Sequence, residues 1–143
     1  MAINFITQHI KFDLQQKMAV KNWIKAVIES KNKKLGELSF VFTSDEELLK
    51  VNQQYLNHNT FTDIITFDNS TKNLVNGDII ISVDRVYENS NKFKVEAEEE
   101  MRRVIIHGVL HLLGFKDKKK SDAEQMRKAE NRALNLFYNL SNK

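Results

Sequence analysis

The amino-acid sequence predicts an α+β domain, in which a mixed sheet of about four strands packs against several helices. Three observations predict this class. Short β-rich runs alternate with segments of helical period, and two longer helical segments close the chain. The 143 residues, 41% of them apolar, suit one compact core. No repeat, linker or low-complexity segment interrupts them, so residues 1–143 are expected to form a single domain.

The first half of the chain predicts two strands and two helices. Residues 3–7 and 38–43 have the β-rich composition of strands, and the second run is apolar enough to be largely buried. Between them, the apolar side chains of residues 13–30 recur with the period of a helix. Ser44 and Glu47 then form a capping box, in which each side chain satisfies a free backbone N–H at the start of a second helix.

The middle of the chain predicts two further strands. The second helix should end near Leu56, and residues 63–67 and 77–82 are both β-rich. An Asn-Gly pair at the start of the later run predicts a turn just before it. A short helix is expected over residues 84–91.

The last third of the chain predicts the longest helices. Residues 95–113 begin with an acidic turn, which suits the positive end of a helix dipole. The second half of this segment is apolar nearly all round, which predicts a central buried helix. Ser121 and Glu124 form a second capping box, for a final amphipathic helix that ends near residue 140.

Two histidines four residues apart in the central helix indicate a metal site. His107 and His111 lie on one helix face, because a helix turns once every 3.6 residues. Gly114 is placed to end that helix, after which the chain can fold back and bring Asp117 toward both imidazoles. Two nitrogens and one carboxylate oxygen, with a fourth position open, are typical of a catalytic zinc site. The alternative is a pair of core histidines, although only four histidines occur in the chain.

The sequence disfavours several other kinds of site. The histidine pair resembles the protease signature H-E-x-x-H, but Gly108 replaces the glutamate that acts as the base there. The chain has no cysteine, no glycine-rich phosphate loop and no serine in a nucleophile elbow. No apolar run approaches the roughly 20 residues of a membrane span, and no secretory signal is recognisable. A cytoplasmic location without membrane contact is therefore expected.

The net charge of +3 and the pI of 9.0 are mildly basic, and the distribution of lysines is more informative than the total. They gather in a first lysine cluster (Lys31, Lys33 and Lys34) and a second lysine cluster (Lys116, Lys118, Lys119 and Lys120). The second cluster surrounds the third candidate ligand, where it would attract a phosphate backbone, although a merely solvated loop explains it equally well. The first cluster is interpreted as a solvated loop.

Three blocks of sequence together carry a resemblance. The segment 107–117 (HGVLHLLGFKD) follows the pattern H-G-x-L-H-L-x-G-[YF]-D-H up to its last two positions. Upstream, Asn52, Tyr55 and residues 62–67 (TDIITF) resemble N-x-x-Y…T-D-V-L-S-F, and residues 77–82 (GDIIIS) resemble G-D-I-x-I-S. In this order the blocks resemble the YbeY family of bacterial endoribonucleases. Chain length and flanking helices fit as well, so the resemblance takes in essentially the whole domain.

The resemblance implies a zinc-dependent, single-strand-specific endoribonuclease, a hydrolase of RNA phosphodiester bonds. It implies a role in late ribosome quality control and in maturation of the 3′ end of 16S rRNA, with rRNA and the small ribosomal subunit as partners. One Zn²⁺ per chain is expected, and nickel or manganese stays open. The alternatives are a non-catalytic assembly factor with a structural metal, and a metallohydrolase of small or peptide substrates. The oligomeric state is not predicted.

One departure from the family pattern falls on the third ligand. Asp117 stands where the family has its third histidine, and Lys116 stands where it has an aspartate. Because a carboxylate can replace an imidazole on zinc, the histidine pair and Asp117 are the predicted metal ligands. Asp122 and Glu124 are the alternatives for the third position.

A second departure concerns the substrate phosphate. Leu56 stands where the family has an arginine thought to handle that phosphate. Arg103 lies four residues before His107, hence on the same helix face, and is the first candidate for its replacement. His107, His111 and Arg103 are therefore the predicted catalytic residues, with Arg102 and the second lysine cluster as alternatives to Arg103.

Several neighbouring residues have roles that the sequence leaves open. Asp63 and Asp78 either orient the imidazoles through their second nitrogens or simply end strands. His58 is interpreted as a surface residue. Three aromatic side chains either stack on unpaired bases or belong to the core: Phe61, Phe67 and Phe115.

Overall fold

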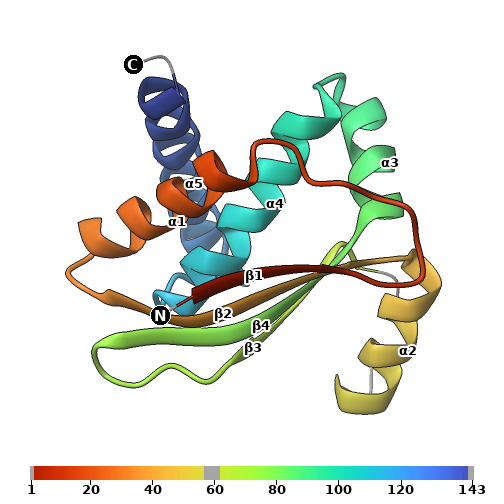
Figure 1. Ribbon diagram of the computed structural model, residues 1–143, viewed down its shortest axis with the longest axis horizontal. Coiled ribbons are helices and arrows are strands. Elements are labelled where there is room, and N and C mark those ends of the chain that lie inside the picture. Colours follow the sequence, from red (N-terminus) through yellow and green to blue (C-terminus); the bar gives the residue numbers. More distant parts are fainter. Residues whose placement is uncertain (1, 57–61, 142–143) are drawn as a thin grey trace.

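The computed structural model describes residues 2–56 and 62–141. In chain order the elements are β1 (Ala2–Thr7), α1 (Lys17–Ser30), β2 (Lys34–Thr43), α2 (Asp45–Leu56), β3 (Ile64–Asp68), β4 (Leu74–Ser82), α3 (Val83–Phe93), α4 (Ala97–Leu112) and α5 (Lys120–Ser141). This succession confirms the predicted α+β class (Figure 1). Among these helices, none is both long and apolar enough to cross a bilayer.

The sheet has the strand order β1-β2-β4-β3 and is mixed, as predicted. β1, β2 and β4 run parallel, and β3 pairs antiparallel with β4. β2 and β4 occupy the centre, where alternate side chains such as Phe40, Phe42 and Ile81 are buried under the helices. A parallel pair of this kind needs a crossover, which α1 provides between β1 and β2.

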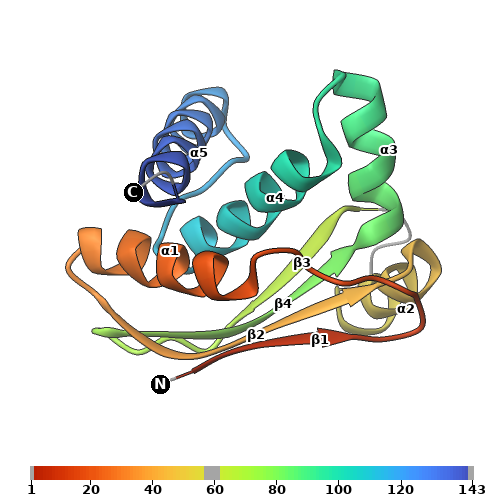
Figure 2. The same cartoon turned by 45° about the horizontal axis from the view of Figure 1, so that its top comes forward.

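α1 and α4 lie side by side over one face of the sheet, and α5 packs above both of them (Figure 2). Trp23 on α1 is fully buried, and its indole N–H donates to the carbonyl of Ala133 on α5 at 2.6 Å. Ile105 and Ile106 on α4 are also fully buried. The predicted central buried helix is therefore confirmed, and it is held on both sides by packed layers.

Several sequence predictions of element boundaries were wrong. β2 begins at Lys34 rather than at residue 38. α1 begins at Lys17 rather than at residue 13, because Gln16 has a left-handed backbone (φ 57°) that a helix cannot contain. Leu14 is nevertheless buried, which explains why the apolar residues of this segment follow the period of a helix. α5 begins at Lys120, so Ser121 lies inside the helix and does not cap it. By contrast, Ser44 Oγ accepts the N–H of Glu47 at 3.2 Å, as the first capping box predicts.

A further wrong boundary concerns the Asn-Gly pair, which lies inside β4 and not in a turn. Gly77 is required there by close packing, since a Cβ at this position would lie 2.5 Å from the carbonyl oxygen of Phe67. β3 and β4 therefore pair through a position that admits no side chain.

Replacing Gly77 by alanine is expected to destabilise the protein by about 1–3 kcal/mol, because the backbone of β3 must move to relieve the contact. Urea unfolding of the two proteins measures this difference. Asp78→Ala, at the exposed neighbouring position of β4, is the control and should stay within about 0.5 kcal/mol of the parent. An unchanged midpoint for Gly77→Ala would contradict the packing argument.

Candidate metal centre

The last two turns of α4 and the turn that follows bring three ligand atoms to one point. α4 ends at Leu112, and Gly114 takes a positive φ of 101°. The N–H of Phe115 donates to the carbonyl of Leu110 at 3.0 Å, which reverses the chain. Asp117 Oδ2 thereby lies 3.1 Å from His107 Nε2 and 3.2 Å from His111 Nε2, and the two imidazole nitrogens are 3.0 Å apart. The structure thus brings together the three residues that the sequence singled out.

The chemistry of these donors fits a divalent cation. His107 Nδ1 donates to the Glu130 carboxylate at 2.7 Å, and His111 Nδ1 donates to the carbonyl of Phe115 at 3.0 Å. Each imidazole therefore turns its unprotonated Nε2 toward the other and toward the Asp117 carboxylate. Three electron-pair donors that face one another repel unless a positive charge lies among them. Donors of a tetrahedral zinc site lie about 3.3 Å from one another, close to the separations seen here.

Gly108 explains why this site differs from that of the glutamate-base proteases. A Cβ at this position would lie 2.9 Å from Ile64 Cδ1 and 3.0 Å from Ile79 Cγ2. The position therefore faces the sheet, at the closest approach of α4, and has no room for a carboxylate beside the histidines.

Glu130 on α5 is the residue of the site that the sequence analysis missed. Its side chain is 6% exposed, and it accepts hydrogen bonds from both His107 Nδ1 and Arg103, the latter at 2.9 Å. Arg103 also donates to Asn131 Oδ1 at 2.9 Å. The sequence did contain a signal, because position 130 is an acid within the buried stripe of α5 that includes Met126 and Ala133.

The protonation of this network favours positive charge at the cluster. Burial by itself lowers the pKa of His107, but the hydrogen bond and charge of Glu130, with the charges of Asp117 and Asp63, raise it above the ordinary 6.5. Burial by itself raises the pKa of Glu130, but hydrogen bonds from His107 and Arg103 hold it below its usual value. Glu130 is therefore ionised, and its negative charge favours either a proton on His107 or a metal ion at the cluster.

The raised pKa of His107 predicts opposite pH dependences for the metal-free and metal-loaded protein. In the metal-free protein, protonated His107 contributes stability that is fully present below about pH 6.5 and is lost as the pH rises through its folded-state pKa. A metal ion must displace that proton, so stabilisation by added Zn²⁺ should grow as the pH rises from about 6 to 8. Thermal unfolding with and without Zn²⁺ across this range measures both trends. A gain in Tm that does not vary with pH would contradict the prediction.

A cleft of about 370 Å³ opens beside the cluster and is lined by His107, Asp117, Arg103 and Asp63 among others. Burial raises the pKa of Asp63, although the charges of His107 and Arg85 oppose that effect. Neither Asp63 nor Asp78 holds a ring nitrogen of the histidine pair; Glu130 and the Phe115 carbonyl do so instead.

The other residues singled out by the sequence lie as follows. Phe67 contacts Tyr55 edge to face, with ring centroids 5.9 Å apart, and Phe115 is half-buried beside the cluster. His58 and Phe61 lie outside the described residues. Asp122 and Glu124, the alternative third ligands, are not part of the three-residue cluster.

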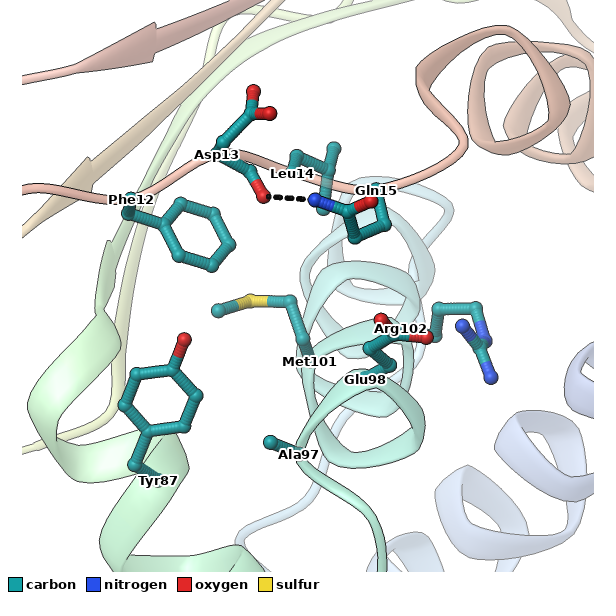
Figure 3. Close-up of a pocket in the computed structure, with 9 residues that line it drawn as sticks. All are labelled: Phe12, Asp13, Leu14, Gln15, Tyr87, Ala97, Glu98, Met101 and Arg102. Carbon is teal, nitrogen blue, oxygen red and sulfur yellow. Dashed lines mark hydrogen bonds between the residues drawn. The ribbon is translucent and has the colours of Figure 1, made fainter.

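A separate cavity of about 250 Å³ lies between the segment before α1 and the first turns of α4 (Figure 3). Phe12, Tyr87 and Met101 supply its apolar wall, and the Gln15 side chain donates to the carbonyl of Asp13 at 3.1 Å. It contains none of the three cluster residues.

Comparison with known proteins gives matches over nearly the whole chain. The family model described as "Endoribonuclease YbeY" matches residues 2–138. A protein of Christiangramia forsetii named endoribonuclease YbeY is 48% identical over 136 residues, which cover 95% of this chain and 94% of that protein. A protein of the same name from Flavobacterium psychrophilum is 49% identical over 129 residues, which cover 90% and 92% respectively.

A likeness of fold extends to a solved structure. The solution structure of TM1509 from Thermotoga maritima superposes with a TM-score of 0.69 and 20% identity, covering 96% of this chain and 90% of that one. At that identity the likeness concerns the fold alone, and it agrees with the α+β architecture described above.

Proposed function

This chain belongs to the YbeY family of endoribonucleases, and from that premise we propose that it cleaves single-stranded RNA at the cluster on α4. We place its action in the maturation of the 3′ end of 16S rRNA and in late quality control of the small ribosomal subunit. The cytoplasm is then the expected compartment, and residues 1–143 would act as one domain. The observation that carries the proposal is the meeting of two imidazole nitrogens and one carboxylate oxygen within about 3 Å of one another.

His107, His111 and Asp117 would hold the metal ion, and zinc is the ion that we expect there, since this donor set with an open position is found in catalytic zinc sites. A bound zinc ion supplies Lewis acidity toward a phosphoryl oxygen or lowers the pKa of a water molecule. Glu130 and the Phe115 carbonyl fix the two imidazoles, so that both Nε2 atoms stay directed at one point. Asp117 replaces the family's third histidine and reduces the positive charge of the loaded site.

Arg103 and Asp63 complete the proposed site from the adjoining cleft. The Arg103 guanidinium is engaged by Glu130 and Asn131, so a direct phosphate contact by Arg103, as the sequence predicts, would have to use its remaining N–H groups. Asp63 is the candidate for proton transfer to or from the RNA, because it lines the cleft beside His107 and burial raises its pKa above the usual value of a carboxyl group.

A direct test uses a labelled precursor of the 16S rRNA 3′ end, single-stranded or annealed to its complement. Discrete cleavage of the single strand alone is expected, with loss of cleavage on chelation and recovery on adding Zn²⁺. Cleavage that persists after complete chelation would remove the metal-dependent mechanism. Absence of cleavage, with Tm falling on chelation, would favour the alternative of an assembly factor with a structural metal.

A further inference from the structure

A third hollow, separate from the cleft beside the cluster and from the cavity of Figure 3, lies beyond the end of α4, on the turn that carries Asp117. It measures about 280 Å³ and is lined by Leu113, Gly114, Phe115, Lys116, Asp122 and Gln125. Phe115 connects this hollow to the metal cluster, because its backbone carbonyl accepts the His111 Nδ1 hydrogen bond at 3.0 Å. Its ring is half-buried, so an aromatic surface remains next to the site.

The fold brings the first lysine cluster to the same place. Lys31, the residue that follows α1 and caps its C-terminus, lies with its Nζ 5.4 Å from the centre of the Phe115 ring. Lys31 and Lys34 are exposed, as the interpretation of a solvated segment predicts, and Lys31 in addition adjoins the turn that carries Asp117. The N–H of Lys34 donates to the carbonyl of Asn73 at 2.9 Å, which places the turn between β3 and β4 beside it.

Both ribbon views agree with this arrangement, because the end of α1 and the turn between β3 and β4 lie at the same end of the molecule (Figures 1 and 2). Three segments at this end of the molecule carry lysines: the end of α1 with the start of β2, the turn between β3 and β4, and the turn after α4. Lys31, Lys34, Lys72 and Lys116 are all exposed. Such a group produces a local positive potential that is independent of the small net charge.

The hollow and its surroundings carry charges of opposite sign, which suit a base and a phosphate respectively. The hollow itself contains the carboxylate of Asp122, which repels phosphate but can accept hydrogen bonds from the amino or imino groups of a base. The Gln125 amide can both donate and accept. The Phe115 ring packs partly against the core and has Lys31 Nζ 5.4 Å from its centre, so its exposed part is what a base can stack on. The surrounding lysines suit phosphate oxygens instead.

We propose that this hollow is a nucleobase site, in which an unpaired base of the RNA stacks on Phe115 while the flanking lysines hold the adjoining phosphates. The proposal rests on the proposed endoribonuclease function and names where the substrate lies next to the metal cluster. A single strand can fill such a site and a duplex cannot, because the base must leave its stack to enter. The arrangement thus gives a physical reason for single-strand specificity in this chain.

Binding of two oligonucleotides tests the base contact. The probes are a fluorescein-labelled oligouridine and the same ribose-phosphate chain with abasic positions, both measured under chelation so that no strand is cut. Phe115→Leu should weaken binding of oligouridine about tenfold, since base–aromatic stacking contributes on the order of 1–3 kcal/mol. Its affinity for the abasic chain should not change. Phe115→Tyr keeps a ring and should retain the affinity of the parent.

The phosphate contacts are tested by a variant that combines Lys34→Ala, Lys116→Ala and Lys118→Ala. It should bind both probes more weakly, and the slope of log K against log salt should fall by about 2, since each phosphate contact on a single strand contributes about 0.7. The control combines Lys11→Ala, Lys17→Ala and Lys50→Ala, which removes the same charge from exposed lysines elsewhere. Tyr87→Leu is the control for a partly exposed aromatic residue in another cavity.

The outcomes separate this proposal from the proposed function. Equal loss of both probes in Phe115→Leu, or no loss of either, would overturn the base site while leaving metal-dependent cleavage by the parent protein intact. Equal effects of the two triple lysine variants would overturn the phosphate contacts. Loss confined to the base-bearing probe, with an unchanged unfolding midpoint, would support the base site.

Discussion

Replacing His111 by alanine is expected to abolish RNA cleavage and to weaken Zn²⁺ binding by more than about a hundredfold. The expected size follows from a comparison, because removing a partner that merely orients a ligand already costs roughly 10–100-fold in metal affinity. His111 contributes a ligand atom itself, and its Nε2 lies within 3.2 Å of both other donors. Competition with a zinc-binding dye measures the affinity, and the labelled precursor RNA measures cleavage.

His9→Ala is the matched control for that variant. The His9 side chain is 62% exposed, and its ring nitrogen lies 4.0 Å from a carboxylate oxygen of Glu47, outside the cluster. It should bind Zn²⁺ and cut RNA as the parent does. If His111→Ala cleaves as fast as the parent, the observed nuclease is a contaminant or the reaction does not use this cluster.

Replacing Glu130 by glutamine is expected to lower the affinity for Zn²⁺ by roughly 10–100-fold. The carboxylate accepts from two donors at once, His107 Nδ1 and Arg103, whereas an amide has one acceptor oxygen and turns its NH₂ toward the other donor. His107 then loses either its fixed orientation or its tautomer. Glutamine has nearly the same size and shape as glutamate, so the packing of α5 against α4 is preserved.

Two comparisons make the Glu130 prediction specific. Glu124→Gln, at an exposed position of the same helix, should leave the affinity for Zn²⁺ unchanged. Glu130→Ala should in addition lower the free energy of unfolding by about 1–3 kcal/mol, because it leaves the half-buried Arg103 and His107 without their acceptor. If Glu130→Gln binds Zn²⁺ as tightly as the parent, Glu130 stabilises the packing of α5 on α4 but does not position His107.

Arg103 is held by the same carboxylate as His107. The sequence placed Arg103 on the face of His107, and the structure agrees, since both side chains meet Glu130. What the sequence does not reveal is that this guanidinium is already engaged by Glu130 and Asn131. Its direct role toward phosphate stays a prediction.

The sequence by itself determined the ligand cluster, because all its parts lie within eleven residues. Helical periodicity places His107 and His111 on one face, and a glycine that tolerates positive φ turns the chain so that Asp117 returns. These are local effects of backbone geometry, which a short stretch of sequence specifies. The sheet was predictable for a similar reason, since its buried strands are short runs rich in β-branched and aromatic residues, which the sequence shows directly.

Only the tertiary structure decided what surrounds the cluster. Glu130 reaches His107 from another helix, and Lys31 reaches Phe115 from the end of α1. Position 77 of β4 requires glycine because a carbonyl oxygen of the neighbouring strand approaches too closely for a Cβ. The contacts of Glu130 and Lys31 join residues far apart in the chain, and the contact at Gly77 depends on how β3 pairs with β4. No periodicity or spacing in the sequence encodes these distances. They meet only because the packing of α1, α4 and α5 on the sheet fixes all these elements together.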